Sequence, residues 1–151
     1  MRQAKEVSIR VSRDAGEVFE AAVGVVQGAK GRQILAVHNE GRKLVVREKP
    51  KFSNPKFVLV GVTADGAGSQ MHVVVGADPR TPSALLDGTM NDRALKKFVE
   101  AVQAALDGSA PAPASPVTNH YLKKKTQVPW LDPNQEPEIE LGGNLLAVYG
   151  L

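Results

Sequence analysis

The sequence predicts an α+β domain, in which about five strands form an antiparallel sheet with both helices on one face. Three observations predict this class. Five segments are rich in β-branched residues, two segments have apolar residues at helical spacing, and four of the strands follow one another as hairpins. Hairpin-linked strands form antiparallel sheets, which bury one face under helices. We expect this domain to span residues 1–107, with a linker over 108–117 and an extended C-terminal arm over 118–151.

The first strand and helix follow from the first 28 residues. Residues 5–12 alternate apolar and polar side chains, which is typical of a half-buried strand. Asp14 and Glu17 have the spacing of a capping box, so a helix is expected to begin here and to end near Gly28. Gly24 lies inside this helix, where glycine costs up to about 1 kcal/mol relative to alanine, and this predicts close packing. The apolar stripe of the helix consists of Phe19, Ala22, Val23 and Val26.

The four further strands are expected in two hairpins. A short turn at 39–41 joins the first pair, and a longer glycine-rich loop at 65–69 joins the second. Between the hairpins, the prolines of segment 49–56 exclude a central strand. The four expected strands are residues 33–37, 43–47, 57–63 and 71–77.

The second helix is expected to begin at a cap provided by Thr89 or Asn91 and to end at Gly108. Its apolar residues repeat at i, i+3, i+4, i+7 and i+11, which predicts one buried ridge. This ridge consists of Leu95, Phe98, Val99, Val102 and Leu106.

Residues 6–26 resemble the opening of START-like, or polyketide-cyclase-like, domains, in which a strand runs into a helix near a Val-Phe pair, here Val18 and Phe19. The helix from Asn91 to Leu106 is similar to the long C-terminal helix of that superfamily. The resemblance implies an apolar ligand cavity beneath that helix. The chain lacks the family's second short helix and has four further strands instead of six. Its order of elements is closer to that of TATA-binding-protein-like domains. The resemblance assigns a role to no residue.

Composition limits the function only coarsely. The 151 residues include no cysteine, which excludes disulfides and thiolate sites, and the net charge is +3. No segment has the length and apolar character of a signal peptide or a spanning helix. We therefore expect a cytoplasmic protein without a membrane partner.

The sequence carries no catalytic or metal-binding signature. His38, His72 and His120 lack the spacing of a zinc site. The run 66–69 resembles a phosphate loop, but a strand rather than a helix follows it, so a hairpin loop is expected. We predict that the protein is not an enzyme and needs no cofactor.

A basic segment is the first candidate binding site. Exposed cations with nearby aromatic residues can bind nucleic acid or another anion. The alternative is a solvated strand face whose lysines discourage edge pairing. The six cations are Arg42, Lys43, Arg47, Lys49, Lys51 and Lys56.

The C-terminal arm is the second candidate. Its large apolar and aromatic residues favour burial, whereas its prolines exclude a long helix. We expect the end of the arm to pair with a sheet edge of its own chain or of a second copy in a homodimer. The alternative is a disordered tail or a peptide ligand of another protein. The candidate residues are Tyr121, Trp130, Leu145, Leu146, Val148 and Tyr149.

These features predict a non-enzymatic binding or assembly module. Two alternatives remain open: a START-like carrier of an apolar small molecule, and a nucleic-acid or anion binder that uses residues 42–56.

Overall fold

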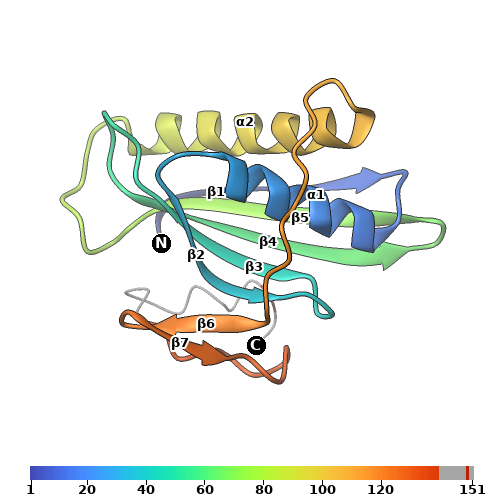
Figure 1. The fold of residues 1–151 in the computed structure, drawn as a ribbon. Helices are drawn as coiled ribbons and strands as arrows, with labels where there is room; N and C mark the ends of the chain where they lie inside the picture. Colours follow the sequence, from blue (N-terminus) through green and yellow to red (C-terminus); the bar gives the residue numbers. More distant parts are fainter. Residues whose placement is uncertain (140–148, 150–151) are drawn as a thin grey trace.

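The computed structural model describes residues 1–139 and 149, and it confirms the α+β class (Figure 1). All strands of the described residues belong to one antiparallel sheet in the order β1-β5-β4-β3-β2-β6-β7. In chain order the elements are β1 (Arg2–Val11), α1 (Ala15–Gly28), β2 (Arg32–His38), β3 (Lys43–Glu48), β4 (Lys56–Asp65), β5 (Gly68–Ala77), α2 (Asp87–Asp107), β6 (His120–Lys123) and β7 (Thr126–Pro129).

The sheet has seven strands rather than the expected five. The two additional strands, β6 and β7, form a hairpin within the predicted arm, and β6 pairs with β2 through Ala36↔Tyr121 and Val37↔His120. Each of these strands has only four residues, so neither is long enough to show a clear alternation. Within the described residues, it is the middle of the arm that continues the sheet, whereas most of the arm's end, for which pairing was predicted, lies outside them.

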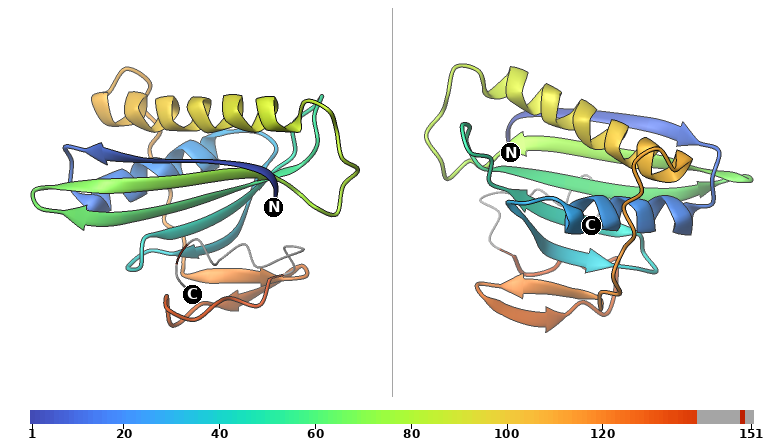
Figure 2. Two further views of the ribbon diagram at one scale, coloured as in Figure 1. Left: turned by 180° about the vertical axis from the view of Figure 1, so that it is seen from behind. Right: turned by 45° about the horizontal axis from the view of Figure 1, so that its top comes forward.

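Both helices pack on the same face of the sheet, as the two apolar ridges predict (Figure 2). The core between them contains Phe19 of α1 and Phe98 of α2, which are 4% and 1% exposed. Val60 and Val73 of the central strands β4 and β5 form the floor beneath these rings.

The ends of the helices agree only partly with the expected caps. Asp14 caps α1 by accepting the N–H of Gly16 at 3.0 Å, but Glu17 pairs with Arg13 instead of completing a capping box. Helix α2 begins at Asp87, before the expected caps Thr89 and Asn91, and no side chain caps its first turn. Gly108 ends α2 in the left-handed conformation, with φ of 82°.

A buried ion pair explains the early start of α2. The Asp87 carboxylate accepts the N–H of Ala84 at 3.0 Å and lies 3.3 Å from the Arg2 guanidinium. Asn54 also donates to Asp87 at 3.3 Å. Arg2 and Asn54 lie far from Asp87 in the sequence, so local spacing gives no sign of these two partners.

The loops also differ in detail from the expectation. Asp65 pairs with Gly68, so the turn between β4 and β5 contains two residues and is shorter than the predicted loop. The turn between β2 and β3 lies where the sequence predicts it, at residues 39–42. Neither described helix combines the length and the apolar character needed to cross a bilayer.

Candidate functional site

Residues 110–119, here called the strap, leave the end of α2 and cross the outer side of α1 in an extended conformation (Figure 1). Gly24 makes the close approach possible, because a Cβ atom at this position would lie 1.9 Å from the carbonyl oxygen of Ala112. The close packing predicted at Gly24 is therefore confirmed. The apolar strap residues Ala112, Ala114 and Val117 pack against the main apolar cluster, to which α1 contributes.

Two side chains fix the strap at its second half. Gln27 of α1 donates to the carbonyl of Ser115 at 3.0 Å and accepts the N–H of Ser115 at 2.8 Å. Asn39, in the turn after β2, donates to the carbonyl of Val117 at 2.8 Å. The backbone N–H of Asn39 donates to the Asn119 side chain, also at 2.8 Å. The strap is thus held at both sides of the space between α1 and this turn.

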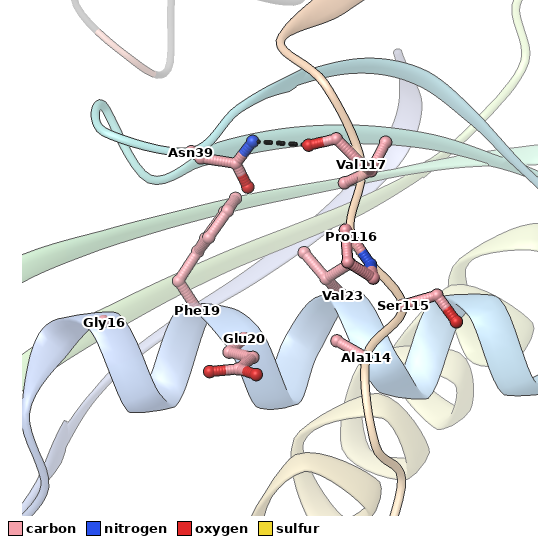
Figure 3. A pocket seen from close by; sticks show the side chains of 9 residues that line it. All are labelled: Gly16, Phe19, Glu20, Val23, Asn39, Ala114, Ser115, Pro116 and Val117. Carbon is pink, nitrogen blue, oxygen red and sulfur yellow. Dashed lines mark hydrogen bonds between the residues drawn. The ribbon is translucent and has the colours of Figure 1, made fainter.

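A pocket of about 330 Å³ lies between α1 and the strap (Figure 3). Ligand pockets commonly have about 300–1,000 Å³ and apolar walls with a few polar groups. Here Phe19 and Val23 come from α1, and the hydrogen bond between Asn39 and Val117 closes one end. The remaining lining residues are Gly16, Glu20, Ala114, Ser115 and Pro116.

The polar groups of this pocket are mainly acceptors. Glu20 is exposed at its rim and has no hydrogen bond or ion pair within residues 1–139 and 149. The amide nitrogen of Asn39 is already used by Val117 and by the side chain of Asn119. A molecule in this pocket therefore meets apolar walls and a free carboxylate, an arrangement that suits a hydrogen-bond donor and disfavours an anion.

The space beneath α2 is filled by side chains. Leu95, Phe98 and Val102 are 5%, 1% and 0% exposed in the core between α2 and the sheet. The Arg32 guanidinium stacks over the Phe98 ring at 5.6 Å. The cavity that the START-like resemblance implies beneath the second helix is thus occupied by its own apolar ridge.

The structure does not bring the six cations of segment 42–56 onto one exposed surface. Lys49 and Lys51 are exposed, whereas Lys56 is buried, and burial lowers the pKa of its ammonium group. Arg42 donates to the carbonyl of Val62 at 3.1 Å, and Arg47 lies 3.6 Å from the Asp78 carboxylate. Anion or nucleic-acid binding by these residues stays a prediction.

Lys43 and Tyr149, from the two predicted sets, lie together on the sheet face opposite the helices. The Lys43 ammonium donates to the carbonyl of Pro133 at 2.6 Å and lies 5.9 Å from the centre of the Tyr149 ring. The Tyr149 hydroxyl lies 2.6 Å from the carbonyl oxygen of Leu44, and burial raises its pKa. With Arg42 they line a pocket of about 400 Å³.

Trp130 anchors the arm to the same face. It is 3% exposed and packs with Phe57 and Leu59 in a second apolar cluster, against which Tyr121 is half-buried. Its indole N–H donates to the carbonyls of Asp132 and Gln135, at 2.8 and 3.1 Å. Leu145, Leu146 and Val148 lie outside the described residues. Exchange of the arm between two copies stays a prediction.

Sequence reasoning identified Gly24 and Phe19 but missed Gln27, Asn39 and Ser115. These three residues act through contacts between distant segments, and no local pattern distinguishes them from ordinary surface residues. Within residues 1–139 and 149, no three histidine, aspartate or glutamate side chains are grouped so that they could hold a metal ion.

Comparison with known proteins informs the fold of this chain but not its candidate site. No protein-family model matches the sequence, and no curated protein matches it. The crystal structure of Ara h 8.0201 matches with a TM-score of 0.53 at 12% identity, over 70% of this chain and 97% of that chain. The structure of DynU16, from the dynemicin biosynthetic locus, matches with a TM-score of 0.52 at 15% identity. That match covers 75% of this chain and only 50% of DynU16. These likenesses are consistent with the START-like, polyketide-cyclase-like fold that the N-terminal residues suggest.

Proposed function

We propose that this protein is a non-enzymatic binding module that holds a small, largely apolar molecule between α1 and the strap. The observation that carries the proposal is the pocket of about 330 Å³ with Phe19 and Val23 in its wall and Glu20 at its rim. The ligand has an apolar body and at least one hydroxyl or amine donor, because the charged group at the rim of this pocket, the Glu20 carboxylate, is an acceptor.

The fold supports this proposal without determining the ligand. In this chain the ridge of α2 occupies the space in which START-like domains carry an apolar cavity. The strap creates a replacement on the other helix, where its backbone and the exposed side of α1 form the walls. A bound molecule would contact the small accessible parts of Phe19 and Val23, which are 4% and 3% exposed.

Binding of a neutral apolar dye, N-phenyl-1-naphthylamine, to the full chain tests the location of the site. Ala114→Leu places a larger side chain in the pocket wall and is expected to weaken dye binding at least tenfold. Ala94→Leu is the matched control, because Ala94 lines a different pocket, which α2 forms together with Arg32 of β2 and Glu48 of β3. Equal effects of the two variants, or no dye binding together with no retained small molecule in native mass spectrometry, would refute the proposed site.

The polar end of the ligand is tested with Glu20→Gln. This variant keeps the shape of the side chain and removes its charge, so a bound amine or hydroxyl is expected to lose affinity while the neutral dye does not. Glu17→Gln is the control on the same helix, since Glu17 is already paired with Arg13 at 3.2 Å. The retained small molecule is quantified for each variant by native mass spectrometry.

A further inference from the structure

The outer edge of β1 is a long open edge of the sheet. The described sheet ends in β1 on one side and in β7 on the other (Figure 2). Strand β7 has only four residues and ends in Pro129, and short edges of this kind resist further pairing. Strand β1 has ten residues, and β5 is its one partner strand in the described part of the chain.

The open part of this edge spans residues 5–11. A register shift lies between Arg2 and Lys5, and Gln3 has a φ of 53°, so the first residues of β1 are irregular. Asn91 of α2 donates to the carbonyls of Arg2 and Gln3, at 3.4 and 2.9 Å, and thereby covers this end. From Lys5 onward the pairing with β5 is regular, and alternate backbone groups point away from it. Ser8 lies at the centre of this open stretch.

The side chains of the open stretch are self-complementary about Ser8. If a second β1 pairs antiparallel with the two-fold axis at Ser8, Glu6 lies opposite Arg10 at two symmetric positions. Both side chains are on the sheet face away from the helices. On the helix face, the half-buried Val7 and Ile9 lie opposite each other. Opposite charges and apolar pairs at facing positions stabilise antiparallel strands, so this register satisfies both faces together.

A groove of about 390 Å³ with an apolar wall and a charged rim runs beside the same edge, and the polar lining residues are Glu6, Asp92, Lys96, Glu100 and Gln103. Its wall contains Val7 of β1 together with Leu95 and Val99 of α2, and no residue of β5 takes part. The groove therefore lies on the open side of β1. A strand added there would place its own helix-face residues, Val7 and Ile9 of the second copy, next to this groove.

The present partners of the two charged residues do not prevent this pairing. Glu6 lies 2.8 Å from the His72 ring nitrogen, and Arg10 lies 3.3 Å from the Asp65 carboxylate. The side chains of Glu6 and Arg10 are 65% and 50% exposed, and exposed ion pairs of this kind contribute little. Both residues are free to turn toward a neighbouring strand.

We propose that two copies of this chain associate through antiparallel pairing of β1 with β1, centred on Ser8, and form one continuous sheet. The pairing uses the open edge of both copies, so the assembly closes as a dimer and does not grow into a fibre. The interface differs from the arm-mediated homodimer that the sequence suggests, because β6 of the arm already pairs with β2 of its own chain. The proposal is independent of the ligand pocket.

Charge reversal at the paired positions tests both the interface and its register. Sedimentation of the full chain from low micromolar to submillimolar concentration is expected to show a monomer–dimer equilibrium. Glu6→Arg and Arg10→Glu each place like charges opposite each other at two positions, so each is expected to weaken the dimer about tenfold or more. The double variant restores opposite charges and is expected to restore the dimer. Glu136→Arg and Lys125→Glu are control reversals on the exposed arm, with no expected effect.

Hydrogen exchange gives a second measurement that needs no variant. Amides of residues 5–11 are expected to become more protected as the concentration rises. A chain that stays monomeric over this range overturns the proposal. So does a dimer that tolerates both single reversals, or one whose added protection lies in residues 118–129, since the latter indicates exchange of the arm.

Discussion

Substitution of Gly24 tests how tightly the strap is held to α1. In Gly24→Ala the new Cβ atom would lie 1.9 Å from the carbonyl oxygen of Ala112 and 3.1 Å from the backbone nitrogen of Ala114. Cβ atoms essentially never lie within 3.0 Å of a non-bonded heavy atom, so the strap backbone has to move by more than 1 Å. Both close neighbours are backbone atoms, and rotation of a side chain therefore cannot relieve the overlap.

A second glycine of the same helix provides the control. A Cβ atom at Gly28 meets no atom within 4 Å, and the conformation of Gly28 is not left-handed. Both substitutions remove the low helix propensity of glycine, a gain of up to about 1 kcal/mol. Only Gly24→Ala adds overpacking, which costs about 1–3 kcal/mol. We therefore expect Gly24→Ala to be less stable than Gly28→Ala by about 2 kcal/mol.

Urea unfolding of both variants measures this difference, provided that the m-values stay equal. Binding of the dye N-phenyl-1-naphthylamine reports whether the pocket survives, because displacement of Ala114 moves one of its walls. Equal stability of the two variants, with dye binding retained in both, would show that the strap does not rest on Gly24. The reasoning that places the pocket between α1 and the strap would then be wrong.

Three further predictions concern the arm and the buried charges. Trp130→Ala is expected to destabilise the docked arm by about 3–5 kcal/mol, measured by hydrogen exchange of the β6 amides. The neighbouring Leu131 is 86% exposed, so Leu131→Ala is expected to change the stability of the docked arm by no more than about 0.5 kcal/mol. Hydrogen bonds from the Ala84 N–H and from Arg2 hold the pKa of Asp87 below its ordinary value, so its contribution is present at neutral pH and is lost as the pH falls through the folded-state pKa. Asp87→Asn is expected to lower the free energy of unfolding by about 1–2 kcal/mol at pH 7. This difference from the wild-type protein should vanish in acid, and a difference that persists there would contradict the stabilising role of the Asp87 carboxylate. Burial lowers the pKa of Lys56, so Lys56→Met is expected to raise the unfolding free energy at pH 7 by about 1 kcal/mol, with a smaller gain as the pH rises through the lowered pKa.

The elements of the predicted domain follow from the sequence because each of them has to bury one face. Strand β1 shows Val7 and Ile9 at a period of two, and α2 shows Leu95 and Phe98 at a helical period, so local pattern and global fold agree. Gly24 was identified by the same logic, since an unfavourable residue in a helix needs a compensating contact. The class and the common face of the two helices were therefore predictable.

The hairpin of β6 and β7 was not predictable in this way. Its pairing with β2 depends on backbone groups, which any sequence provides, and Pro129 and the lysines beside the turn argue against a strand. Tyr121 and Trp130 indicated burial but not its location. The early start of α2 was missed for a similar reason, because Arg2 and Asp87 are separated by more than eighty residues and meet only in the folded chain.

The turn between β2 and β3 connects the strap on one face with the arm on the other. Asn39 holds the strap through Val117 and Asn119. Its neighbour His38 accepts the N–H of Gly41 at 2.9 Å, lies 3.3 Å from the carbonyl oxygen of Leu131, and packs edge-on against Trp130 at 5.5 Å. Successive residues of a strand point to opposite faces, so two neighbours at its end are suited to hold segments on both sides. The turn therefore contacts the strap on one face of the sheet and the arm on the other, through two residues that are adjacent in the sequence.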